Sequence, residues 1–185
     1  MQGKRSPDGR FEEWKWSREI IRLITEKFDS LGINYAIDNE TDYEIGLNNR
    51  VRNTNKIAKG YSNRAIFISI HANAAGAGLE WLNARGFSVY TTRGQTRADT
   101  YADIIYGQFK IAFPDIKTRE DYSDGDPDIE SNFSVLLCRP PAVLIETMFQ
   151  DNKDDVEIML SEEFKARFAE MIVKAVIVIV SSVSH

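Results

Sequence analysis

Hydrophobic side chains recur with a helical period in the first part of the chain. Between residues 12 and 31 one stripe of the pattern is apolar and the opposite stripe is charged; the apolar members are Trp16, Ile20, Leu23, Ile24, Phe28 and Leu31. Gly32 follows, and glycine is the residue that most often ends a helix in the left-handed conformation. The spacing therefore predicts an amphipathic helix over residues 12–31.

The same stripe places one acidic side chain on the apolar face. Counting three residues back from Trp16 leads to Glu13, so Glu13 is expected to point toward the core while Glu12 points outward. A buried carboxylate is costly unless it meets a metal ion or another cation. The alternative is a partly solvated glutamate that the helix dipole favours in the first turn. The pattern alone leaves both interpretations open.

Two short apolar runs, the first interrupted only by Ser69, indicate strands that are buried on both faces of a parallel sheet. They are Ala65–Ile70, within the segment RAIFISIHANA (Arg64–Ala74), and Ala142–Ile145. His71 directly follows the first run and Glu146 directly follows the second. Ligands bind at the carboxyl ends of such strands, so the two side chains are expected to lie close together. A histidine packed in the core is the alternative for His71.

The remaining pattern alternates strands with helices. Strands are predicted over 33–37, 86–91 and 134–137, and helices over 43–59, 96–113 and 161–180. This alternation predicts an α/β fold, a three-layer α/β/α sandwich with a mostly parallel central sheet. A length of 185 residues fits a single domain over residues 1–185.

Composition and charge exclude several classes of function. The net charge of −5 argues against a nucleic-acid groove, which would gather Lys and Arg. The single cysteine, Cys138, cannot form an internal disulfide. The opening residues MQGKRSPDGR lack the apolar core of a signal peptide. The most apolar window, Met171–Val180, is too short to cross a bilayer, so no membrane partner is predicted.

An acidic loop over 117–130 contains three alternating aspartates, Asp124, Asp126 and Asp128. Calcium loops have this alternation, but they also need a glycine where this chain has Ile129. The stronger candidates are therefore Glu13, His71 and Glu146. One histidine and two carboxylates at one edge of a sheet suit either a hydrolytic zinc site or an acid/base pair.

At these residues the chain resembles a known family, the zinc-dependent N-acetylmuramoyl-L-alanine amidases of bacterial cell-wall hydrolases and phage endolysins. The most specific segments are SIHANA, Ser69–Ala74, and PAVLIETMFQDNKDD, Pro141–Asp155. Weaker similarities are Leu47, Arg50 and Asn55 in the predicted second helix and NFSVL, Asn132–Leu136. The segment GKRSPDGRFEEWKWSREI resembles a phage- or prophage-associated branch of the family.

The resemblance implies a role for each candidate. Glu13 and His71 match zinc ligands and Glu146 matches the catalytic glutamate. The implied reaction cleaves the amide between N-acetylmuramic acid and the L-alanine of the stem peptide, with peptidoglycan or a muropeptide as substrate. Zn²⁺ would lower the pKa of a bound water and polarise the carbonyl, and the glutamate would move the proton. Asn73 either supports the neighbouring ligand or simply forms a turn after the strand.

One departure from the family pattern affects the metal site. The family's first strand ends in a Gly-His-Gly motif that supplies a further zinc ligand, whereas this chain has no histidine before His71. Gly3–Gly9 resembles the segment that follows the motif. We therefore expect the chain, through trimming or a misassigned start, to lack this strand and ligand, to bind zinc weakly and to cleave poorly. Its sheet would then have an exposed edge, which favours self-association. The other histidine, His185, is a poor replacement at the end of the chain.

Two alternatives to a zinc amidase follow from the same residues. A non-catalytic peptidoglycan-binding module would keep the fold and the cleft without the metal. A metal-free hydrolase would use His71 and Glu146 as an acid/base pair, but the sequence offers it no obvious nucleophile. The resemblance implies action on the cell wall or in the periplasm. The lack of a signal peptide in this chain would fit a phage-type lysin made in the cytoplasm.

Overall fold

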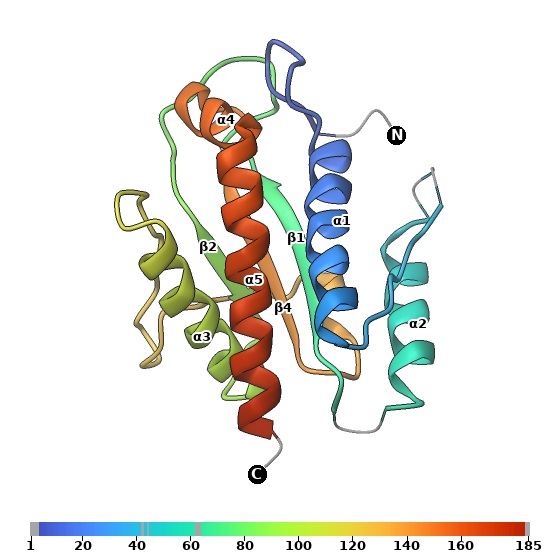
Figure 1. The fold of residues 1–185 in the computed structure, drawn as a ribbon. Helices are drawn as coiled ribbons and strands as arrows, with labels where there is room; N and C mark the ends of the chain where they lie inside the picture. Colours follow the sequence, from blue (N-terminus) through green and yellow to red (C-terminus); the bar gives the residue numbers. More distant parts are fainter. Residues whose placement is uncertain (1–3, 42, 44, 62–63, 184–185) are drawn as a thin grey trace.

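The computed structural model describes residues 4–41, 43, 45–61 and 64–183, and its centre is a four-stranded sheet in the order β1-β4-β2-β3 (Figure 1). The strands are β1 (Phe67–Asn73), β2 (Ser88–Thr91), β3 (Ile129–Glu130) and β4 (Ala142–Phe149). β1 pairs with β4 and β2 pairs with β3 in parallel, whereas β2 and β4 are antiparallel. The sheet is therefore mixed, with parallel pairing at both of its edges.

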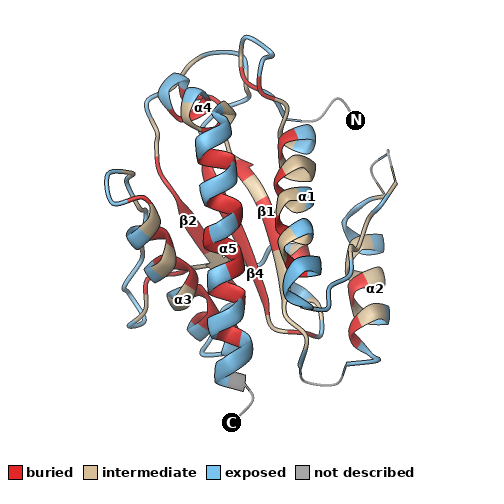
Figure 2. Cartoon of the chain, in the orientation of Figure 1, coloured by how far each residue is buried: buried red, intermediate tan, exposed pale blue. Residues whose placement is uncertain are grey.

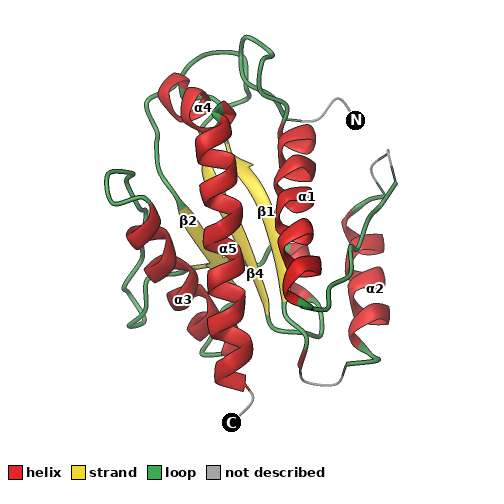
Figure 3. Cartoon of the chain, in the orientation of Figure 1, coloured by secondary structure: helices red, strands yellow, loops and turns green. Residues whose placement is uncertain are grey.

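Helices cover both faces of this sheet, which gives the three layers predicted from the sequence. The helices are α1 (Glu13–Leu31), α2 (Leu47–Ala58), α3 (Arg97–Ala112), α4 (Lys153–Leu160) and α5 (Glu162–Val183). On one face α5 packs between α1 and α3 (Figure 3). On the other face the short 3-10 helix η2 (Ser134–Leu137) packs against both β4 and α2. No helix among the described residues is long and apolar enough to cross a membrane.

The central position of β4 in the sheet explains why the run Ala142–Ile145 is continuously apolar. Every residue of β4 is buried, as Figure 2 shows. Val143 and Ile145 belong to the large core under α1, α3 and α5, whereas Ala142 and Leu144 belong to a smaller cluster with η2. Alternate side chains thus enter the two cores, as expected for a strand with helices on both faces.

Two predicted strands are absent because neither segment pairs with a neighbour. Residues 33–37 form no strand; Ile33 donates its N–H to Phe28 at the end of α1, and the segment joins no sheet. Residues 134–137 form η2 instead of a strand. Its adjacent residues Val135 and Leu136 are both buried in the cluster with Leu144. Consecutive residues of a strand would point to opposite faces, so a helical turn is needed to bury both on one side.

The element boundaries move in a way that affects the site. β1 continues through Asn73 and β4 continues through Phe149, so His71 and Glu146 lie within their strands and not after them. α2 begins at Leu47 because Gly46 has a φ of 78°, outside the helical region. A separate helix, α4, precedes α5, and the two meet at Ser161.

Candidate active site

The pairing of β1 with β4 places the two predicted strand residues side by side. His71 is the register partner of Glu146, and on the other side of β4 Ser88 is also a partner of Glu146. Glu146 lies two residues beyond Leu144, so its side chain points to the same face as the η2 cluster. The site therefore lies on the η2 side of the sheet, toward the carboxyl ends of β1 and β4.

Glu13 reaches the same place from the first turn of α1. Its Oε1 atom lies 3.0 Å from His71 Nδ1 and accepts a hydrogen bond from the Ala72 N–H at 3.1 Å. The other ring nitrogen, Nε2, lies 2.8 Å from Ser69 Oγ. These contacts hold both edges of the imidazole ring. Glu13 thus has a hydrogen-bond partner in the imidazole of His71, at the position in the apolar stripe where a buried carboxylate requires one.

The pKa of Glu13 is the result of opposing effects. Burial raises the pKa of this carboxyl, but the hydrogen bond and charge of His71, the charge of Lys4 and the Ala72 N–H together lower it below its ordinary value. A carboxylate that accepts hydrogen bonds and lies near positive charge is stabilised in its charged form. Glu13 is therefore ionised at neutral pH, as a metal ligand has to be.

Glu146 has the opposite environment. The residue is only 8% exposed, and its Oε2 atom has no hydrogen-bond partner. Burial raises the pKa of Glu146 to about 7, the charges of His71 and Lys4 lower it in part, and the charge of Glu13 raises it. A carboxyl with a pKa near the working pH is suited to general acid–base catalysis because it can both accept and return a proton.

The two expected metal ligands are brought together, and the donor set they form is incomplete. A carboxylate oxygen and an imidazole nitrogen are both normal zinc ligands. A catalytic zinc usually has three protein ligands, whereas the described residues contain no group of three or more His, Cys, Asp and Glu side chains placed to hold a metal. His185, the weak replacement considered from the sequence, lies outside the described residues.

Sequence reasoning missed two supports of the site. Ser69 reads as part of a buried strand, yet its hydroxyl contacts His71. Asp151, which is fully buried, accepts hydrogen bonds from the N–H groups of Ala75 and Gly76, both at 2.8 Å. This carboxylate holds the loop that follows β1. The polar run QDNKDD after a buried strand was the available signal for such an anchor.

Asn73 takes the turn-forming role that the sequence offered as one of two interpretations. Its Oδ1 accepts the N–H of Ala74 at 2.8 Å, and its main-chain carbonyl accepts the N–H of Gln150 at 2.8 Å. Both contacts fix the exit of β1. They do not test a role in supporting a bound metal.

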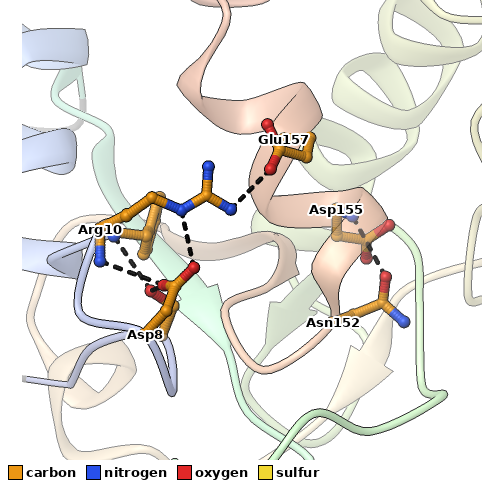
Figure 4. A network of polar contacts seen from close by, with 7 residues as sticks. Asp8, Arg10, Asn152, Asp155 and Glu157 are labelled. Carbon is orange, nitrogen blue, oxygen red and sulfur yellow. Dashed lines mark hydrogen bonds and ion pairs between the residues drawn. The ribbon is translucent and has the colours of Figure 1, made fainter.

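A second polar network ties the N-terminal turn to α4 (Figure 4). Arg10 donates to Asp8 at 2.6 Å and to Glu157 of α4 at 2.5 Å. The hydroxyl of Ser6 and the Arg10 guanidinium lower the pKa of Asp8 to about 2. This turn leads directly into α1, so the network helps to place the first turn that contains Glu13.

Asn152 and Asp155 lie at the start of α4 (Figure 4). Asn152 caps α4 by accepting the N–H of Asp155 at 3.1 Å. The buried Asp155 carboxylate accepts hydrogen bonds from Arg85 at 2.8 Å and from the Gly86 N–H at 3.2 Å. The loops around the carboxyl ends of the strands are therefore anchored on the start of α4.

A family model and a curated relative that match this chain carry the same description. The profile of the N-acetylmuramoyl-L-alanine amidase family matches residues 2–178. The N-acetylmuramoyl-L-alanine amidase AmiC of Neisseria meningitidis serogroup B is 26% identical over 209 residues, which cover 94% of this chain and 48% of that protein. The chain thus spans about half the length of this curated relative.

Solved structures show the same fold at lower identity. An N-acetylmuramoyl-L-alanine amidase from Clostridium difficile 630 superposes with a TM-score of 0.82 at 22% identity, covering 98% of this chain and 90% of that chain. The catalytic domain of the amidase CwlV from Bacillus (Paenibacillus) polymyxa var. colistinus has a TM-score of 0.75 at 21% identity, with coverages of 95% and 88%. The catalytic domain of the CD27L endolysin has a TM-score of 0.67 at 19% identity, with coverages of 95% and 87%.

Proposed function

Because this chain belongs to the N-acetylmuramoyl-L-alanine amidase family, we propose that it hydrolyses the amide bond between N-acetylmuramic acid and the L-alanine of the peptidoglycan stem peptide. The observation that carries the proposal is the register pairing of His71 with Glu146, with Glu13 in contact with the histidine. One ionised carboxylate, one imidazole and one carboxyl of raised pKa meet at a single point of the sheet.

Glu146 is the general base in this proposal. Its buried carboxylate takes a proton from the attacking water and returns it to the leaving L-alanine nitrogen. The atoms balance, because the water oxygen becomes part of the new lactyl carboxylate and the released stem peptide has a free α-amino group. The unpartnered Oε2 of Glu146 is the oxygen available for this transfer.

Glu13 and His71 are the proposed zinc ligands. When bound there, Zn²⁺ would polarise the scissile carbonyl and lower the pKa of a coordinated water. Glu13 supplies a negative charge, and the contact with Ser69 orients the histidine ring. Since two protein ligands are fewer than the usual three, we expect weak zinc binding and slow cleavage by this chain.

One further candidate function rests on the incomplete donor set among the described residues. A peptidoglycan-binding module with the same fold would bind muropeptides at this face without cutting them. An endolysin role belongs to the amidase proposal as its finer form; it is supported by the resemblance of the N-terminal segment to phage-associated family members.

The deciding experiment treats purified peptidoglycan with this chain at increasing Zn²⁺ and identifies the products by mass spectrometry. The amidase proposal expects stem peptides with a free L-alanine amine, at a rate that rises with Zn²⁺ and falls with a chelator. Activity that survives the chelator would favour the metal-free acid/base pair. Muropeptide binding without products at saturating Zn²⁺ would favour the binding module.

Zinc content measured by elemental analysis on the same samples separates metal loading from chemistry. We expect less than one Zn²⁺ per chain after dialysis, because the described donor set has two members. Stoichiometric zinc would show that Glu13 and His71 have a further ligand in this chain. Full loading without cleavage would overturn the amidase proposal.

A further inference from the structure

An exposed aromatic ring on the η2 side of the sheet has no role in the hydrolysis described above. Phe133 directly precedes η2, is 40% exposed and packs against Tyr90 of β2, with the ring centroids 5.3 Å apart and the ring planes at 61°. Edge-to-face packing against a second ring restricts the orientation of the exposed one. The two side chains therefore present a flat, oriented apolar surface to solvent.

The register of β2 with β4 places this aromatic pair beside the candidate site. Tyr90 is the register partner of Leu144, and Ser88, two residues earlier in β2, is the partner of Glu146. Residues two apart in a strand point to the same face, and Tyr90 packs against the η2 cluster that contains Leu144. The spacing and rise of strands put the Cα atoms of Tyr90 and Glu146 about 8 Å apart. The pair therefore borders the site on its β2 side.

The two sides of Glu146 differ in charge. On the side of β1 and α1, the carbonyl of Lys4 accepts the Glu13 N–H at 3.0 Å, and the charge of Lys4 acts on both Glu13 and Glu146. On the β2 side, the segment over residues 120–133 contains six acidic residues and no Lys or Arg. An anionic part of a ligand is therefore favoured toward Lys4, and an uncharged part is favoured over the aromatic pair.

We propose that the exposed ring of Phe133, backed by Tyr90, is a glycan subsite that binds the uncharged N-acetylated sugar next to the reacting N-acetylmuramic acid. This inference rests on the proposed function, because it takes the amide beside Glu146 as the scissile bond. A sugar ring has an apolar face of C–H groups that can stack on a flat aromatic ring while its hydroxyl groups stay in water. The stem peptide, which has free carboxylates, then extends toward Lys4. The subsite selects stem peptides that are still attached to a glycan.

The opposite orientation would place the stem peptide over Phe133 and the glycan toward Lys4. The carboxylates of the peptide would then lie beside the acidic segment 120–133, where like charges repel them, and away from the cation. The ring of Phe133 offers contact area without a hydrogen-bond donor or a charge, which suits a sugar face better than a carboxylate. Both observations favour the glycan as the occupant of the aromatic pair.

The test compares two soluble substrates with the same stem peptide, one attached to N-acetylmuramic acid alone and one to the disaccharide with N-acetylglucosamine. The KM of the unchanged chain should be lower for the disaccharide by about three- to tenfold, the range expected for one aromatic contact. Phe133→Leu keeps an apolar side chain over Tyr90 without a flat ring, so the two KM values should become equal. Phe133→Trp should keep the preference. Tyr122→Ala is the matched control, because this exposed ring contacts Glu120 instead, and it should leave the KM ratio unchanged.

Binding of an N-acetylglucosamine tetramer, followed by NMR titration, gives a readout that needs no cleavage. Phe133→Leu should weaken its Kd by about three- to tenfold, and Tyr122→Ala should not change it. If the tetramer binds through Phe133 but neither substrate is cleaved, the subsite stands and the amidase proposal fails. If cleavage occurs and Phe133→Leu changes neither the KM ratio nor tetramer binding, the subsite is wrong. An equal rise of both KM values would assign the ring to the shared muramoyl peptide and overturn the proposal. If Phe133→Leu fails to fold, tetramer-induced shifts at Phe133 and Tyr90 of the unchanged chain decide.

Discussion

Glu146 and Asp128 are two buried carboxyl groups whose pKa values are both raised to about 7, and their surroundings differ. Glu146 has a free Oε2 and lies beside His71 in the β1–β4 register. Asp128 is 1% exposed, its Oδ2 accepts a hydrogen bond from Thr91, and its Oδ1 has no partner either, so an unpartnered oxygen does not distinguish the two groups. For Asp128, burial and the neighbouring carboxylate of Asp126 raise the pKa.

The comparison shows that a raised pKa alone does not mark a catalytic group. At Asp128 two carboxyl groups share a closed site, and protonation relieves their repulsion. At Glu146 the neighbours are a histidine and an ionised carboxylate, which are the groups that bind metals and orient substrates.

The largest effect is expected for removal of the general base. Glu146→Gln keeps the size of the side chain and cannot accept a proton, so cleavage of muropeptides should fall by about 10²–10⁴-fold. Asp128→Asn is the matched control and should cleave at the rate of the unchanged chain. Liquid chromatography of the released peptides measures both rates. Equal loss in the two variants would show that burial, and not position, explains the effect.

The next effect concerns the metal. His71→Ala should weaken Zn²⁺ binding by at least about 10–100-fold, because loss of a direct ligand costs no less than loss of a group that supports one. Competition with a chromophoric chelator measures the affinity. The control is Cys138→Ser, which removes the single thiol, a group that burial keeps protonated by raising its pKa to about 11. If only the cysteine variant loses zinc, the assignment to Glu13 and His71 is wrong.

The pH dependence of the reaction tests the raised pKa of Glu146. A general base has to be ionised, so kcat/KM should rise by about tenfold per pH unit below pH 7 and level off above it. Asp128→Asn should show the same profile. A rate that is independent of pH between 5 and 8 would assign proton transfer to another group.

The smallest expected effect is on the free energy of unfolding, and it comes from Asp128. Its folded pKa is raised to about 7 from an unfolded value near 3.9, so the native state binds this proton more tightly. The stabilisation of the folded state that this proton provides is complete below about pH 4 and is lost as the pH rises through 7. Asp128→Asn cannot lose a proton there, and at pH 8 it should be more stable than the unchanged chain by about 1–2 kcal/mol. Urea unfolding at pH 5 and pH 8 measures the difference, which should shrink at the lower pH.

The pattern of apolar and polar residues along the chain was sufficient to predict several elements of this protein and the site residues on them. The apolar stripe of residues 12–31 identified α1 and turned Glu13 inward, and the two apolar runs located β1 and β4 beside His71 and Glu146. These features depend on the periodicity of side chains along one element, which neighbours in sequence already determine.

Tertiary structure decided how those elements meet. The pairing of His71 with Glu146, the 3.0 Å contact of Glu13 with His71 and the raised pKa of Glu146 all depend on residues far apart in the chain. The strand expected at 33–37 did not form, since a strand exists only through hydrogen bonds to a neighbour and its pattern cannot supply one. Side-chain periodicity is a local property, whereas pairing, burial and pKa are properties of the assembled fold.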